Sequence, residues 1–115
     1  MAIYEELIVD QGSTFKYQLN LTDPNSGAAY NLAGFTVNAY MKKNYKSTSP
    51  AGIFTTEVDT GVQGRINLSL TDEQTAVIKA GRYFFDVIIE SPIGEVFRIV
   101  EGIVDVTPSV TIITP

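Results

Sequence analysis

Cysteine and histidine are both absent from this sequence of 115 residues. Without cysteine the chain has no disulfide framework, no thiolate nucleophile and no Cys-ligated zinc or iron–sulfur site. Without histidine it lacks the side chain that most often serves as a general base near neutral pH and as a transition-metal ligand. These absences exclude Ser-His-Asp and Cys-His catalytic arrangements and His-based zinc sites. We therefore expect no enzyme activity and no cofactor.

Positive charge and long apolar runs are also scarce. The chain has 8 Lys and Arg against 13 Asp and Glu, a net charge of −5. Nucleic-acid binding relies on a cationic surface that neutralises phosphates, so no nucleic-acid partner is expected. No stretch approaches the roughly 18 apolar residues of a membrane span. Glu5 and Glu6 stand where a signal peptide would carry cations and an apolar core, so we expect a soluble protein without a membrane partner or an export signal.

What the sequence does contain is alternation of apolar and polar residues with a period of two, the pattern of half-buried β-strands. Seven segments suggest strands, at residues 3–9, 15–21, 35–41, 53–58, 66–70, 83–89 and 96–106, the first as an edge strand and the fourth weakly. Regular spacing with turn signals between the strands predicts an all-β fold, an immunoglobulin-like antiparallel β-sandwich. We assign it to residues 1–106 and expect a C-terminal tail at 107–115.

One stretch interrupts the strands with a helical signature. Thr71 is followed three residues later by Gln74, the spacing of a capping box, and Gly81 suits the end of a helical turn. The pattern predicts a single short helical turn near residues 72–78. In an immunoglobulin-like sandwich such a turn connects the two sheets.

The strand after this turn has two aromatic residues near its start, Tyr83 and Phe85. In an immunoglobulin-like sandwich a tyrosine at this point hydrogen-bonds back across the corner, and Tyr83 stands at that position. Phe85 stands two residues on, where an antibody domain has its second cysteine. The alternative is that Tyr83 is an ordinary core aromatic residue.

The polar stretch at residues 42–52 predicts an exposed loop. Lys42, Lys43 and Lys46 surround Tyr45 there and form the only basic cluster of the sequence. A solvated loop is the simplest interpretation. A contact with phosphate, with Tyr45 stacking, is a second, and a contact with another protein, which we favour over phosphate, is a third.

The C-terminal tail is the other candidate contact segment. The last ten residues carry no charged side chain, and they are β-prone apart from Pro108 and Pro115. Pro108 disfavours a central strand. The tail can complete its own sheet or add to a neighbouring chain as a strand, with Val110, Ile112 and Ile113 as candidate contacts.

The carboxylates show no catalytic or metal-binding pattern. Glu57 and Asp59 come near the spacing that a glycosidase needs, but no aromatic-rich cleft is evident around them. Residues 23–27 slightly resemble a calcium loop, and a hairpin turn explains them more simply. Asp86 lies on the strand face opposite Phe85, either solvated or paired with Arg98 or Arg82.

The sequence resembles a known family over nearly its whole length. The stretch "LTDEQTAVIKAGRYFFDVIIESPIGEVFRIVEGIVDVTPSVT" at residues 70–111 is similar to the C-terminal half of small immunoglobulin-like proteins of tailed bacteriophages. The opening "LIVDQGSTFKYQLNLTDPNSGAAYNLAGFTVNAYMKK" is similar to their first half. The motifs are packing and turn residues, so they specify the family better than its role.

The resemblance implies a structural role without chemistry. It implies a component of the virion, in the tail, baseplate or neck, that contacts other virion proteins, is present in several copies, and folds and assembles in the host bacterial cytoplasm. Capsid decoration is the alternative location. A host-surface or carbohydrate-binding module is an alternative of another class, and it would need an exposed aromatic platform, for which Tyr30, Tyr40 and Tyr45 are the candidates.

Overall fold

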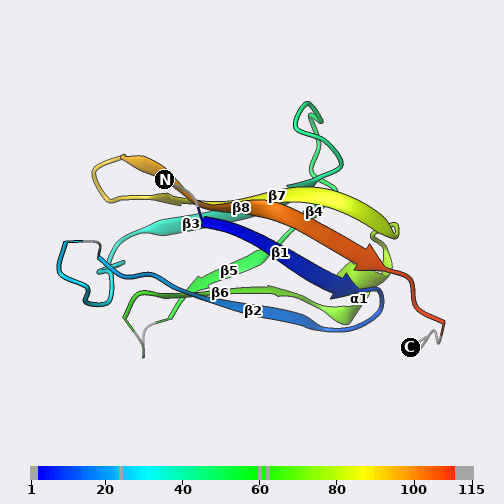
Figure 1. Ribbon diagram of the computed structural model, residues 1–115, viewed down its shortest axis with the longest axis horizontal. Helices are drawn as coiled ribbons and strands as arrows, with labels where there is room; N and C mark the ends of the chain where they lie inside the picture. Colours follow the sequence, from blue (N-terminus) through cyan, green and yellow to red (C-terminus); the bar gives the residue numbers. More distant parts are fainter. Residues whose placement is uncertain (1–2, 24, 60, 62, 111–115) are drawn as a thin grey trace.

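The computed structural model describes residues 3–23, 25–59, 61 and 63–110. Its elements are β1 (Ile3–Asp10), β2 (Phe15–Asn20), β3 (Thr36–Lys42), β4 (Gly52–Ile53), β5 (Thr55–Val58), β6 (Arg65–Leu70), α1 (Asp72–Ala76), β7 (Gly81–Glu90) and β8 (Val96–Thr107). The strands form a five-stranded sheet, in the order β1-β8-β7-β3-β4, and a three-stranded sheet, β2-β6-β5. The two sheets pack as two layers (Figure 1), which confirms the predicted all-β sandwich.

The connectivity matches that of an immunoglobulin-like sandwich. In an immunoglobulin domain the strands are lettered A to G along the chain. In that lettering the smaller sheet, β2-β6-β5, corresponds to strands B, E and D, and β3, β7 and β8 of the larger sheet correspond to strands C, F and G. Most neighbouring strands are antiparallel, but β1 runs parallel to β8, with Ile3 opposite Val100 and Asp10 opposite Thr107. The predicted antiparallel sandwich therefore contains one parallel pair, which the sequence analysis did not predict. No hairpin joins these two strands, which lie at opposite ends of the chain, so no short turn dictates their direction.

The weak strand predicted at residues 53–58 is two strands in different sheets. Phe54 separates β4 from β5 and is only 2% exposed. Its ring lies between Phe15 and Phe85, with centroid distances of 5.9 and 6.1 Å. The chain crosses from the larger sheet to the smaller one at Phe54, and the ring is buried between the sheets at this crossing. The crossing divides the predicted strand into β4 and β5.

The core lies between the sheets and is formed by the inward residues of both. Met41 and Val87 from the larger sheet and Ile66 and Leu68 from the smaller one are at most 1% exposed. Each such side chain stabilises the fold by roughly 1.5–3 kcal/mol when fully buried. The predicted period of two therefore identified the inward faces correctly.

Gly102 allows the edge strand β1 to approach β8 closely. It pairs with Glu5, and a Cβ atom at this position would overlap the carbonyl oxygen of Glu5. A residue with a side chain would have to push β1 away. Gly102 thus fixes the position of β1 on the sheet.

Candidate functional site

The capping box predicted from the sequence is present at the start of α1. The Thr71 hydroxyl accepts a hydrogen bond from the Gln74 amide at 3.1 Å, and the Thr71 amide donates to the Gln74 side chain at 2.8 Å. Two amide groups that have no partner within the helix are satisfied in this way. The helix itself ends at Ala76, within the predicted range.

The tyrosine corner is also present. The Tyr83 hydroxyl donates a hydrogen bond to the Lys79 carbonyl at 2.6 Å, and Tyr83 is 5% exposed. Phe85 is buried two residues further on, against Phe54. Thr71, Gln74, Tyr83 and Phe85 therefore serve the architecture of the corner. Gly81 does not end the helical turn as predicted, because the C-cap is Val77 and Gly81 is the first residue of β7.

The sequence analysis missed a third element of this corner, Thr75. Its side chain is fully buried, and its hydroxyl lies 2.9 Å from the Ser13 carbonyl, to which it donates. The same oxygen accepts from the Gly12 amide at 3.0 Å, and Gln11 donates to the Ile78 carbonyl at 2.7 Å. The turn between β1 and β2 is thereby joined to α1. A lone threonine in a helical turn gives no sequence signal for such a distant contact.

The two solvent-facing sides of the sandwich differ in chemistry. The outward residues of the three-stranded sheet are Lys16, Gln18, Asn20, Thr55, Glu57, Arg65, Asn67 and Ser69, all of them polar. The outward side of the five-stranded sheet, here called the outer face, carries the apolar or aromatic residues Tyr4, Ile8, Tyr40, Ile53, Phe84, Ile88 and Ile103. Of these, Tyr4, Ile8 and Ile53 are more than half exposed. A sheet that faces only water is expected to be polar on that side.

Strand register places the outer-face residues in rows that cross the sheet. One row runs Tyr4, Glu101, Asp86, Tyr40, Ile53, from β1 to β4. The next row runs Glu6, Ile103, Phe84, Lys42. The first row therefore has its charged side chains in the middle, and the second has them at its ends.

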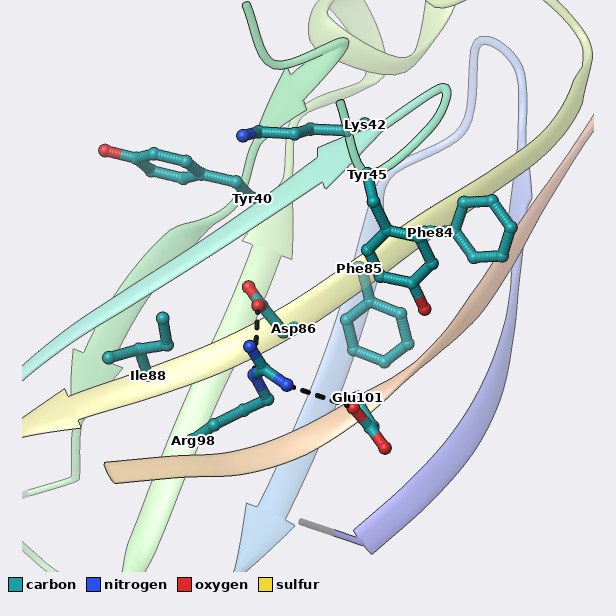
Figure 2. Close-up of a pocket in the computed structure, with 9 residues that line it drawn as sticks. All are labelled: Tyr40, Lys42, Tyr45, Phe84, Phe85, Asp86, Ile88, Arg98 and Glu101. Atoms are coloured by element: carbon teal, nitrogen blue, oxygen red, sulfur yellow. Dashed lines mark hydrogen bonds and ion pairs between the residues drawn. The ribbon is translucent and has the colours of Figure 1, made fainter. Parts of the chain in front are cut away.

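A groove of about 300 Å³ lies on the outer face (Figure 2). Its lining residues are Tyr40, Lys42, Tyr45, Phe84, Phe85, Asp86, Ile88, Arg98 and Glu101. Tyr45 reaches it from the loop between β3 and β4 and stacks on Phe84, with ring centroids 4.6 Å apart and planes inclined by 25°. Tyr45 is nevertheless 75% exposed, so this stack presents an aromatic surface to solvent.

Three of the charged groups that line the groove are paired with one another. The Arg98 guanidinium lies 3.5 Å from the Asp86 carboxylate and 3.4 Å from the Glu101 carboxylate. Burial raises the pKa of Asp86 above its ordinary value, although Arg98 and Lys42 act to lower it. Arg82 instead pairs with Asp105 at 3.0 Å. Of the open alternatives for Asp86, pairing with Arg98 is the one observed.

The predicted basic cluster is divided by the structure. Lys42 and Tyr45 line the groove, whereas Lys43 turns toward the corner, where its Nζ donates to the Arg82 carbonyl and lies 4.9 Å from the centre of the Tyr83 ring. Lys46 is exposed on the loop.

The other candidate contacts lie apart from the groove. Tyr30 packs edge-on against Phe35 at 6.0 Å and is half-buried, so it does not join Tyr40 and Tyr45 in one platform. Val110 is fully exposed, and Ile112 and Ile113 lie outside the described residues.

The acidic side chains do not gather into a metal site in the described part of the chain. No group of three or more Asp or Glu residues there is placed to hold a metal ion. Glu57 and Asp59 both lie within hydrogen-bond distance of the Asn67 amide group, at 3.3 and 3.4 Å, on the three-stranded sheet. Among the same described residues, no helix is long and apolar enough to cross a membrane.

Comparisons with known proteins leave the family unassigned. No protein-family model matches the sequence, and no curated protein matches it either. Among solved structures, the sialic acid-binding region of an adhesin from Streptococcus sanguinis SK1, bound to 3′sLn, is similar with a TM-score of 0.47 and 18% sequence identity. The match covers 91% of this chain and 28% of the adhesin chain. This chain therefore spans less than a third of that structure, and a likeness this low carries no functional argument.

Proposed function

We propose that this protein is a non-enzymatic structural or adaptor component of a tailed-phage virion, in the tail, baseplate or neck, and that it assembles through its outer face. The observation that supports a role in protein contacts is the difference in chemistry between the two sides of the sandwich. One side is wholly polar, whereas the other exposes Tyr4, Ile8, Tyr40 and Ile53. Exposed apolar patches of this kind mark interaction surfaces.

The composition of the outer face suits a protein contact. Tyrosine and arginine are, with tryptophan, the residue types most enriched at the energetic centre of protein interfaces. Here Tyr40, Tyr45 and Arg98 surround one groove. Covering apolar surface contributes about 25 cal/mol per Å² removed from water, so a partner seated on these rings would gain binding energy that the polar three-stranded sheet does not offer.

The phage part of the proposal rests on the sequence resemblance at residues 70–111. The corner formed by Thr71, Gln74 and Tyr83 lies within that stretch, and a β-sandwich is the fold that the resemblance implies. Locating the protein within the particle distinguishes a place in the tail, baseplate or neck from decoration of the capsid.

The test is incorporation into particles of a phage that lacks its own copy of the gene. Ile53→Lys places a charge on the outer face, and Ser69→Lys places the same charge on the three-stranded sheet as a matched control. We expect Ile53→Lys to be depleted from purified particles and Ser69→Lys to be retained, with both proteins folded in isolation. Equal incorporation of the two variants would show that the outer face is not the contact surface.

A second candidate function, carbohydrate binding, is favoured by one feature of the groove. Two tyrosine rings stand beside hydrogen-bond donors, Lys42 and Arg98, and acceptors, Asp86 and Glu101. Sugars combine apolar ring faces with hydroxyls that both donate and accept. Binding on a glycan array that Tyr45→Ala abolishes and Tyr4→Ala preserves would support it, and absence of glycan binding would exclude it.

A further inference from the structure

We infer that the outer face pairs with the same face of a second copy of this chain, around a two-fold axis that runs along β7. This inference rests on the proposed function of the outer face as a contact surface, and it names the occupant of that surface. The argument comes from the distribution of charge, from the strand order and from the position of one loop.

The two sides of the outer face carry opposite charge. The outward residues of β1, on one side, include Glu6 and Asp10 and no cation. On the other side, residues 36–53, which include β3, β4 and the loop between them, contain no acidic residue. Lys42 and Lys46 remain available there, whereas Lys43 turns toward the corner. A uniformly basic or acidic partner would match only one side. A second copy turned by half a rotation matches both sides at once, as an isologous dimer requires.

The strand order gives the face a central line. With β7 in the middle of β1-β8-β7-β3-β4, a two-fold axis along β7 places β1 of one copy over β4 of the other. Tyr4 and Ile53 are the two ends of one row. Each would therefore meet the other across the contact, and two pairs of exposed apolar side chains would be covered.

The loop between β3 and β4 completes the match. It rises above the outer face (Figure 1), and its Tyr45 ring stacks on Phe84 of the central strand β7. A two-fold axis along β7 therefore brings the loop of each copy against the outer face of the other, and we infer that Lys46 of one copy lies within reach of Glu6 of the other. A standard protein contact covers about 800 Å² per partner, which is roughly a tenth of the 7504 Å² surface of this chain.

Sedimentation velocity of the isolated full chain at low ionic strength, over a range of concentrations, tests the inference. We expect a monomer–dimer equilibrium. Glu6→Lys and Lys46→Glu should each weaken the dimer about tenfold. An equimolar mixture of the two variants should form heterodimers, because the reversed charges are complementary, and the double variant should recover self-association. Circular dichroism verifies that every variant is folded.

Matched charge reversals on the three-stranded sheet, Lys16→Glu and Glu57→Lys, serve as controls and should leave the dimer unchanged. A wild-type protein that is monomeric at every concentration would overturn the inference, as would a dimer indifferent to Glu6→Lys and Lys46→Glu. If a monomer is found and Ile53→Lys is still depleted from particles, only the second-copy inference fails. If a dimer is found and Ile53→Lys enters particles normally, the proposed function fails instead.

Discussion

The Tyr83 hydroxyl and the Lys79 carbonyl form a 2.6 Å hydrogen bond across the corner between α1 and β7. The bond is local, since only four residues separate its partners, yet it fixes where the chain enters the central strand of the larger sheet. The groove residues Phe84 and Asp86 follow directly in that strand. The corner therefore positions the outer face.

Replacement of Tyr83 by Phe removes this hydrogen bond and keeps the ring. We expect the free energy of unfolding to fall by about 0.5–1.5 kcal/mol, because the Lys79 carbonyl loses its partner in a mostly buried site. Urea denaturation measures the change. Tyr40→Phe, on the exposed outer face, is the control and should be within about 0.5 kcal/mol of wild type; equal losses would show that the corner bond contributes nothing specific.

Replacement of Gly102 by Ala should displace β1 from β8. The added methyl group overlaps the Glu5 carbonyl, and overpacking of this kind costs about 1–3 kcal/mol. Hydrogen exchange locates the effect, and we expect the amides of β1 to exchange faster while those of β6 change less. An unchanged exchange rate in β1 would contradict the assigned role of Gly102.

The corner and the inward faces could be predicted because their signals are local. A capping box needs only Thr71 and Gln74, and alternation needs only neighbouring residues. The parallel pairing of β1 with β8 could not be predicted, because it joins the two ends of the chain. The apolar character of the outer face could not be predicted, because it depends on the register of strands that are distant in sequence. Strand β7 did give one signal: Phe84 and Ile88, at its outward positions, are apolar like its inward residues.

Replacement of Thr75 by Val keeps the volume of the side chain and removes the buried hydroxyl. The Gly12 amide loses its acceptor, so we expect a loss of about 1–3 kcal/mol in the free energy of unfolding. Thr75→Ser keeps the hydroxyl and should lose less stability than Thr75→Val. If Thr75→Ser is the more damaging of the two, packing rather than hydrogen bonding explains the buried position.

The pH dependence of stability should report on Asp86. Burial raises its pKa in the folded protein above the ordinary value of 3.8, while Arg98, Lys42 and Glu101 surround it. The folded state therefore holds the proton more tightly than the unfolded state. The stability associated with this proton is fully present below pH 3.8 and is lost as the pH rises through the higher folded-state pKa.

Asp86→Asn removes this titration, so relative to wild type the variant should gain stability as the pH rises through that window. Denaturation of both proteins at pH values below 3.8 and near neutrality measures the difference. Glu57→Gln, on the three-stranded sheet, is the control. A relative loss for Asp86→Asn on going to neutral pH would show that attraction to Arg98 outweighs burial.

The central claim is that the outer face is covered in the assembled particle. Hydroxyl-radical footprinting of the isolated protein, diluted until it is monomeric, and of purified particles tests it through side chains that are exposed in the free chain: Tyr45 at 75%, Tyr40 at 41% and, as a control in the turn between β7 and β8, Ile93 at 81%. We predict that Tyr40 and Tyr45 become protected in particles while Ile93 stays reactive. Undiminished labelling of Tyr40 and Tyr45 in particles would contradict the account.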